Sequence, residues 1–277
     1  MLARRKIDYY PTAVVLLVFG LDLAVFHFSS SIWMTIAWSL LMLNIKGFIC
    51  CWNHHHQHRK FFRYEWANRL LETIMGLQTG ALGEGWSLHH TLGHHLNYLD
   101  QTKDESAWKT PDGRIMGRLE YSLTVALLTY PKAIKVGLRH PKLLRKLIEN
   151  FLITGVILAV MCWFNWVNTL ILFILPMAFL LFMTVNETYD HHTGLEVDDP
   201  YQATYNITNR WYNFFTCNLG YHTAHHVTCG KHWSDLPAFH EEIKHKIPSN
   251  LYREPASTFL WMSKLEQWLT GQRQVIN

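Results

Sequence analysis

The stretch IWMTIAWSLLMLNIKGFICCWNHHHQH, residues 32–58, decides the fold of this 277-residue chain. Residues 32–51 are mostly apolar, and at about 1.5 Å per residue a helix of this length crosses a hydrocarbon core of about 30 Å. A cluster of histidines follows the run directly. The stretch therefore predicts a membrane-spanning helix with a group of metal-ligand side chains just beyond its end.

Three further apolar runs accompany this one and predict two helical hairpins. Residues 11–28 form a run that only the turn SSS separates from the span at 32–51. Residues 151–166 and 169–185 form a second pair around the short turn NWVN. We therefore expect an all-α, polytopic membrane protein with four transmembrane helices.

Lysine and arginine set the expected orientation of these helices. The turns 29–31 and 164–168 contain neither, whereas the N-terminal ten residues hold three, segment 52–150 holds fourteen and segment 186–277 holds seven. Because positive residues stay on the cytoplasmic side, we expect both termini and a helical cap made from the two long segments to be cytoplasmic. Spanning and polar segments interleave, which predicts a single domain over residues 1–277.

Two charged residues lie inside the first hairpin. Asp22 falls within the first span, where an acid is either a functional residue or a bundle-facing residue paired with a polar neighbour. Lys46 falls near the inner end of the second span, and its long side chain can extend its ammonium group to the membrane surface.

One apolar stretch, LEYSLTVALLTY at 119–130, is too short to span comfortably. If it crossed the membrane, everything after it would change sides. We expect an interfacial or re-entrant helix there. It is followed by a basic patch suited to anionic headgroups, which consists of Lys132, Lys135, Arg139, Lys142, Arg145 and Lys146.

Composition excludes several classes of function. The formal net charge of +4 is mild, and no dense lysine or arginine stripe indicates a nucleic-acid partner. The five cysteines are scattered without a CxxC pair, which argues against a disulfide framework and favours a reducing compartment.

Four histidine clusters lie at or beyond the inner ends of the spans, all on the expected cytoplasmic side. They are His54, His55, His56 and His58; His89, His90, His94 and His95; His191 and His192; and His222, His225 and His226. The orientation was obtained from lysine and arginine alone, so its agreement with the histidine positions is independent. Four clusters on one membrane face indicate a metal site rather than a histidine-rich surface.

The spacing within the clusters supports metal binding. Residues three and four apart share one face of a helix, so two or three imidazoles can reach one ion. The expected ligands are His54, His58, His90, His94, His95, His191, His192, His222, His225 and His226, although only one of His191 and His192 need bind. His55, His56 and His89 point to other faces and are expected to support the ligands or to lie at the surface.

The number of ligands favours two metal ions. Imidazole suits zinc, copper, iron and nickel, and a zinc site takes four ligands or three with a water. Eight to ten histidines are twice that number. Soluble di-iron bundles rely on carboxylates, whereas imidazoles dominate here, and neutral ligands leave a metal strongly electrophilic and suited to oxygen activation.

Three of the clusters resemble the histidine boxes of the membrane fatty-acid desaturase and hydroxylase superfamily. The matching segments are HHHQH, HTLGHH and HTAHH, in the order of the family's HxxxH, HxxxHH and HxxHH boxes. The resemblance covers nearly the whole chain, from the first hairpin to the tail NLGYHTAHHVTCGKHWSDLPAFHEEI. It departs from the family pattern in the double histidine at 191–192, and in Cys229 and Gly230.

The resemblance implies a non-haem di-iron oxidase with two iron ions, O₂ as co-substrate and a cytoplasmic helical cap over a four-helix stem. The box histidines would be the iron ligands, with a further ligand from the ETYDHHTG segment after the fourth span. Carboxylates and amides orient ligand imidazoles in metal sites. The candidates for this role are Asn186, Glu187, Asp190 and Asp235, together with Asp100 and Asp104.

Two reactions are open. NLGYHTAHH with the following Leu-Pro resembles desaturases, which implies desaturation of a fatty acyl or other lipid alkyl chain. HTLGHH followed by DES, and ETYDHHTGL, resemble alkane ω-hydroxylases, which implies hydroxylation of an alkane or alkyl chain instead. We favour the desaturase.

Electrons would come from a separate donor of the ferredoxin, rubredoxin or cytochrome b5 type with its reductase, because no haem, flavin or iron–sulfur motif is present. Basic residues near the interface could dock an acidic donor or lipid headgroups: Arg59, Lys60, Arg63 and Lys231. A non-catalytic metal transporter or sensor is the other class to consider. Transporters, however, place ionisable ligands within the spans, near the midplane.

Overall fold

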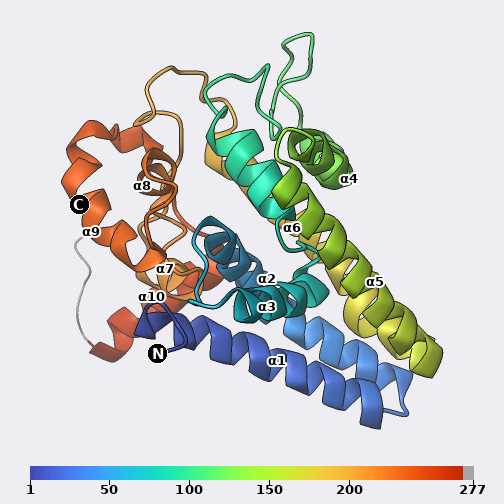
Figure 1. The fold of residues 1–277 in the computed structure, drawn as a ribbon. Coiled ribbons are helices and arrows are strands. Elements are labelled where there is room, and N and C mark those ends of the chain that lie inside the picture. Colours follow the sequence, from blue (N-terminus) through green and yellow to red (C-terminus); the bar gives the residue numbers. More distant parts are fainter. Residues whose placement is uncertain (271–277) are drawn as a thin grey trace. The chain divides into compact units, whose positions relative to one another are not determined.

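The computed structural model describes residues 1–270, and every regular element within them is a helix (Figure 1). The expected all-α class is therefore confirmed. The chain divides into two compact units, Met1–Gly194 and Leu195–Asn277, which are described one at a time below. The single-domain organisation stays a prediction.

The first unit contains all the long helices. In chain order its elements are η1 (Lys6–Asp8), α1 (Tyr9–Phe28), α2 (Ile32–His58), α3 (Glu65–Thr79), the π-helix η2 (Ser87–His95), α4 (Arg118–Gly137), α5 (Pro141–Thr169), the π-helix η3 (Leu170–Ile174) and α6 (Leu175–His192).

Three stretches among the described residues are long and apolar enough to cross a membrane: Lys6–Phe28, Ile32–His58 and Pro141–His192. The first two contain the predicted spans 11–28 and 32–51. The third runs for 52 residues and contains both remaining predicted spans without a separate loop between them. Four separate crossings therefore stay a prediction.

The third stretch is nevertheless folded back on itself. At Asn165 the backbone leaves the helical region, with φ −157° and ψ 89°. Leu147 of α5 and Met177 of α6 pack into the same apolar cluster, although thirty residues of straight helix would separate them by about 45 Å. The arms on either side of Asn165 consequently form a helical hairpin.

The turn of this hairpin lies beside the turn between α1 and α2. The Asn168 side-chain amide donates to the Phe26 carbonyl at 3.1 Å, and its oxygen accepts from the Thr35 hydroxyl at 3.3 Å. A third contact runs from the amide to the Ser29 carbonyl. One asparagine thus fixes both turns at the same end of the first unit.

The charged residues of the first hairpin pair with each other. The Lys46 ammonium lies 2.9 Å from an Asp22 carboxylate oxygen and donates to the Leu172 carbonyl of η3 at 3.0 Å. The other Asp22 oxygen accepts from the Trp38 indole. Both charged side chains are fully buried. The expectation that Lys46 extends to the surface is therefore wrong, because a buried carboxylate one helix away and the π-helical carbonyl hold its ammonium inside.

Helix α4 is longer than the apolar stretch 119–130 from which it was predicted, and it continues through Pro131. It is not among the stretches that are long and apolar enough to span. Its buried face packs on α6 through Tyr121 and Val125, which share a cluster with Val185. An interfacial or re-entrant position for this helix stays a prediction.

The second unit is built from short helices. They are α7 (Arg210–Phe215), α8 (His222–Val227), η4 (Trp233–Asp235), α9 (Leu236–Ile243), η5 (Lys244–Lys246), η6 (Ser249–Leu251) and α10 (Ser257–Thr270). Asn206 forms a bridge with Tyr252, and the Phe259 ring of α10 packs on Tyr212 of α7 at 5.3 Å. These contacts tie the end of the described chain to the segment in front of α8.

Candidate metal centre

The first histidine box occupies the last two turns of α2. His54 and His58 are one turn apart, and their ring centroids are 4.7 Å from each other. The indole N–H of Trp86 donates to Nδ1 of His54 at 3.1 Å, which fixes the plane of that ring. The predicted pairing of these two histidines on one helix face is what the structure shows.

The second box lies on a π-helix rather than an α-helix. A π-helix bonds residues five apart, so His95 lies over His90, and the two Nε2 atoms are 3.0 Å apart. His94 lies beside them, with its ring stacked on that of His90 at 5.0 Å. The offsets of four and five in the sequence are thus both used on one face of the helix.

Close packing behind the second box requires a glycine. A Cβ on Gly93 would lie 2.8 Å from the Cγ of Glu105, and the Glu105 amide donates to the Gly93 carbonyl at 3.2 Å. Lys135 pairs with the Glu105 carboxylate at 2.9 Å. The loop after the box is therefore held against the π-helix.

The two boxes meet in the first unit. One ring nitrogen from each of His54, His58, His90 and His95 lies within 4.8 Å of the others. Burial, reinforced by the neighbouring His95, lowers the pKa of His90 well below its usual range. A largely buried set of imidazole nitrogens at this spacing fits a transition-metal ion, which would replace contacts between like nitrogens by coordination.

A second group forms around His94. Its Nε2 is 3.2 Å from Nε2 of His192, the last residue of α6. Both carboxylate oxygens of Asp104 lie 2.9 Å from Nδ1 of His94. This carboxylate holds the proton on Nδ1 and leaves a lone pair on Nε2, which is the usual arrangement behind a metal-bound histidine.

His191 and His192 occupy different surroundings. His192 faces His94, with 4.7 Å between the ring centroids. His191 is also buried, but it is not in either of the donor groups found among the described residues. The structure thus favours His192 as the partner of His94, and a ligand role for His191 stays a prediction.

In the second unit the third box forms helix α8. The rings of His222 and His226 are 4.7 Å apart, and His225 lies 5.6 Å from each of them. Thr223 anchors the helix, since its hydroxyl accepts from Asn206 at 2.7 Å and its amide donates back to Asn206 at 3.0 Å. The three histidines are thus gathered as their spacing predicts.

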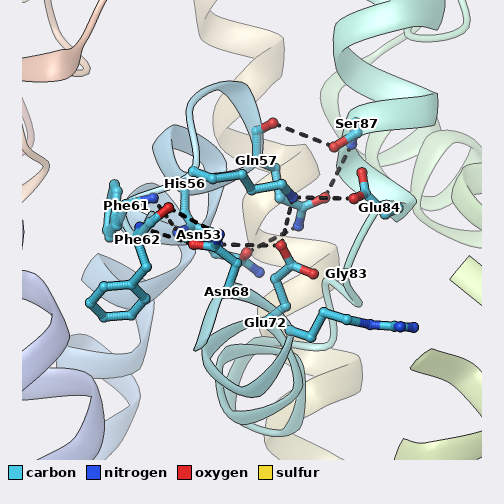
Figure 2. A network of polar contacts seen from close by, with 12 residues as sticks. Asn53, His56, Gln57, Phe61, Phe62, Asn68, Glu72, Gly83, Glu84 and Ser87 are labelled. Carbon is cyan, nitrogen blue, oxygen red and sulfur yellow. Dashed lines mark hydrogen bonds and ion pairs between the residues drawn. The ribbon is translucent and has the colours of Figure 1, made fainter. Parts of the chain in front are cut away.

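The other residues of the first box build a support for the site (Figure 2). His56 accepts from the Phe61 amide at Nδ1, so its proton is on Nε2, which lies 3.3 Å from the Glu72 carboxylate. Lys60 donates to the same carboxylate at 2.6 Å and lies 3.4 Å from Glu84. Both nitrogens of His56 are therefore engaged in structural contacts.

The charges in this support shift the pKa of Glu72. Burial raises the pKa of its carboxyl, but the hydrogen bond from His56 and the Lys60 ammonium outweigh burial and lower it to about 2. Lys60 is thus held by this carboxylate, and its part in docking an acidic donor stays a prediction. His89, also a support candidate, has its pKa lowered to about 3 by burial and by Lys132.

Gln57 and Asn53 connect the first box to the second (Figure 2). The side-chain oxygen Oε1 of Gln57 accepts from the backbone amides of Trp86 and Ser87 at 3.0 and 3.1 Å, where η2 begins. Its amide group donates to Asn53 at 3.0 Å, and Asn53 donates to the Ala81 carbonyl at 2.7 Å. Gln57 and Asn53 thus hold the connector between α3 and η2 against the end of α2.

The predicted orienting residues have several environments. Asp104 contacts His94, as described above. Asn186 donates to Ser122 and also accepts from Arg118, which pairs with Asp190. Asp235 lies in η4 of the second unit, and Asp100 bonds Thr102 and Lys103 at the surface. Glu187 lies exposed on α6.

Sequence patterns gave no signal for the roles of Glu72 and Gly93, and only an indirect one for Gln57. Glu72 is sixteen residues from His56, and Gln57 holds amides about thirty residues away. Such contacts follow from packing and not from a local motif. The only signal was the unusual run of polar residues, NHHHQH, at the end of an apolar helix.

Within residues 1–270, helices long and apolar enough to span a membrane occur together with imidazoles close enough to hold a metal ion, which defines the class of helical membrane proteins with a candidate metal site. The sequence profile of the family described as fatty acid desaturase matches residues 30–256, well over half of the chain. The chain belongs to the fatty acid desaturase family. No curated protein matches it.

Proposed function

We propose that this protein uses O₂ to desaturate a fatty acyl or other lipid alkyl chain at a histidine-bound di-iron centre. The observation that carries the proposal is the buried set of four imidazole nitrogens at the end of a spanning helix. Family membership supports an oxidoreductase that acts on lipid chains. Two iron ions held there would supply the activation of O₂ needed to remove hydrogen from an unactivated C–H bond.

The proposed ligands fall into three groups. His54, His58, His90 and His95 would hold one ion, because their nitrogens converge. His94 and His192 would bind the other through the Nε2 atoms that face each other. His191, His222, His225 and His226 are proposed on the pattern of the boxes alone.

The residues around the ligands would keep them ready to bind. Asp104 holds the proton of His94 on Nδ1, so that Nε2 is directed to the metal. Burial keeps His90 neutral at physiological pH, since its pKa is far below 7. Trp86 covers the His90 ring at 4.8 Å and excludes water from that side.

The proposal includes a place in the cell and a partner. We expect an integral, multi-pass membrane protein with four crossings and with both termini and the active site in the cytoplasm. This follows the distribution of lysine and arginine. Membrane lipids supply the substrate, and a separate ferredoxin, rubredoxin or cytochrome b5 with its reductase supplies electrons.

Hydroxylation of an alkane or alkyl chain is the alternative reaction. It is favoured by the segment ETYDHHTGL, in which His192 lies next to His94. The same centre would serve both reactions, and the two differ in whether a second hydrogen is removed or oxygen is returned to carbon.

Product analysis separates these reactions. The full-length protein is expressed with a donor and its reductase, and lipids and hydrocarbons are analysed by mass spectrometry. Loss of two hydrogens from a chain supports desaturation, and gain of one oxygen supports hydroxylation. An unchanged lipid and hydrocarbon profile with every donor type would overturn the oxidase proposal.

Two controls accompany the experiment. His222→Ala should abolish the product while the protein remains inserted in the membrane, and retained activity would refute His222 as a ligand. Metal analysis of the purified protein should find about two iron ions per chain, as two imidazole clusters require. Zinc alone, with no O₂-dependent product, would favour the transporter or sensor.

A further inference from the structure

Helix α4 has one face that is packed inside the first unit. Tyr121, Val125, Thr129 and Ala133 follow one another at intervals of four and are all buried. The face contacts Val185 on α6 and Leu88 on η2 through two apolar clusters. This face fixes the rotation of the helix about its own axis.

The other side of α4 carries a stripe of large aliphatic residues. They are Leu119, Leu123, Leu127, Ile134 and Leu138, with 43–76% of each side chain exposed. Their spacing of four and seven residues places them on one face, roughly opposite the packed one. Soluble surfaces rarely expose a contiguous aliphatic strip of this length, so the stripe indicates an apolar partner.

The stripe continues the apolar surface of a spanning helix. Tyr130, at its edge, packs on Phe151 of α5 with 4.7 Å between the rings. Around Phe151, α5 exposes Leu152 and Val156. On the opposite edge of α4, Lys135 pairs with Glu105 in the loop behind η2. The apolar edge of α4 therefore faces the spanning part of α5, and its charged edge faces the histidine boxes.

The direction of α4 and the charges after it fit a membrane surface. In Figure 1 α4 is seen almost end-on while α5 lies along the page, so the two helices cross. Arg139, between the two helices, and Lys142, in the first turn of α5, are both exposed. A helix that crosses a span, with aliphatic residues on one side and basic residues at its end, has the features of an interfacial helix.

We propose that α4 lies in the lipid–water interface of one leaflet, with its aliphatic stripe among the acyl chains. Arg139 and Lys142 bind the phosphates of anionic lipids beside it. The occupant of this surface is the bilayer itself. The inference does not depend on the reaction that the protein catalyses.

Photo-crosslinking tests the position of the helix. The full-length protein is placed in nanodiscs of phosphatidylcholine and phosphatidylglycerol that carry a diazirine on the acyl chain, and adducts are mapped after irradiation. Peptide 119–132 should carry adducts, as should the part of α1 around the exposed Leu16 and Leu17. Ile115 is half exposed but lies outside the helix, and it should remain free of adducts.

An absence of adducts on α4 when α1 is labelled would overturn the proposal, because a second copy of the chain or a bound protein would then cover the stripe in place of lipid. In a matched variant, Leu123→Gln with Leu127→Gln should reduce the adducts on α4 several-fold and leave those on α1 unchanged.

The basic residues are tested separately. Nanodiscs that contain phosphatidylglycerol should raise the melting temperature of the protein above its value in phosphatidylcholine alone. Arg139→Gln with Lys142→Gln should remove that difference, whereas Lys103→Gln, an exposed lysine that pairs with Asp100, should preserve it. Equal loss in both variants would show a general charge effect and contradict the assigned phosphate contacts.

Discussion

Asp104 orients one imidazole of the candidate centre. Its carboxylate accepts from Nδ1 of His94, so the lone pair on Nε2 could bind a metal ion. Such partners typically contribute tenfold to a hundredfold in metal affinity. We expect Asp104→Ala to weaken Co²⁺ binding, followed by the visible absorption of the bound ion, by about tenfold or more.

The control for Asp104 is Asp100→Ala. Asp100 lies in the same loop, but its carboxylate contacts Thr102 and Lys103 in an exposed turn, and its loss should leave Co²⁺ affinity unchanged. Equal affinities for wild type and Asp104→Ala would contradict an orienting role.

Glu72 makes stability depend on pH in the acid range. Its pKa is about 2, below the ordinary 4.5. A lowered carboxyl pKa stabilises the fold above the unfolded value, and this contribution is lost as pH falls from about 4.5 to about 2. The lost contribution is about 3 kcal/mol.

Thermal unfolding in detergent between pH 2 and 6 measures this effect. Wild type should lose stability more steeply than Glu72→Gln as the pH falls, because the amide does not titrate. Since other carboxyls titrate in the same range, the difference between the two curves is the relevant quantity. Parallel curves would show that Glu72 has no lowered pKa.

At the level of elements, Gln57 joins the end of α2 to the start of η2. One side-chain oxygen accepts two backbone amides that the first turn of a helix leaves without a partner. We expect Gln57→Leu to shift His90 and His95 relative to His54 and to weaken Co²⁺ binding by about tenfold. Gln57→Glu keeps the acceptor and should retain most of the affinity.

A buried glutamine elsewhere provides the matched control for Gln57. Gln78 on α3 donates to the Val15 and Ile74 carbonyls and does not touch η2 in the described contacts. Gln78→Leu should lower the melting temperature as much as Gln57→Leu but bind Co²⁺ normally. If both variants lose metal to the same extent, Gln57 contributes only to stability.

The Asp22–Lys46 pair joins α1, α2 and η3 inside the first hairpin. Removing one member of a buried pair leaves the other charge buried without its partner, which lowers the free energy of unfolding by about 3–5 kcal/mol. Lys46→Met should therefore be strongly destabilised, while Asp22→Asn combined with Lys46→Met should recover most of the loss. Unfolding in detergent compares the three proteins, and an additive effect of the two changes would contradict the pairing.

For the whole molecule, the shared end of the two turns makes a prediction about membrane topology. Asn168 ties the turn at Asn165 to the one after α1. In a cysteine-free background, Ser30→Cys and Trp166→Cys should both react with an impermeant maleimide from outside the cell. Asp112→Cys should react only after permeabilisation, and labelling of positions 30 and 166 from opposite sides would rule out two outward turns.

Much of the architecture could be predicted from local patterns. Apolar runs located the spanning helices, and intervals of four residues located His54 with His58. The partner of Asp22 could not be predicted, because Lys46 is twenty-four residues away and is brought close only by packing. The π-helix was also missed, since the interval of five between His90 and His95 looks like two separate faces when an α-helix is assumed.

For some residues the sequence pattern is compatible with more than one role. His56 sits in the middle of a histidine run, and only the contacts of its two nitrogens show that it supports the site. Lys60 resembles a surface cation by sequence, yet its ammonium is held by two carboxylates. In both cases the decisive partner, Glu72, lies on a different helix.

The π-helical turn between His90 and His95 makes this part of the chain more sensitive to its length than to the identity of Leu92. Exchange of Leu92 for another aliphatic residue keeps five steps between the two histidines. Insertion or deletion of one residue there would rotate everything beyond it by roughly a quarter of a turn and turn His95 away from His90. Working variants of this segment should therefore keep Gly93 and the Thr91 hydroxyl that contacts Nδ1 of His58, accept substitutions at Leu92, and allow only one spacing.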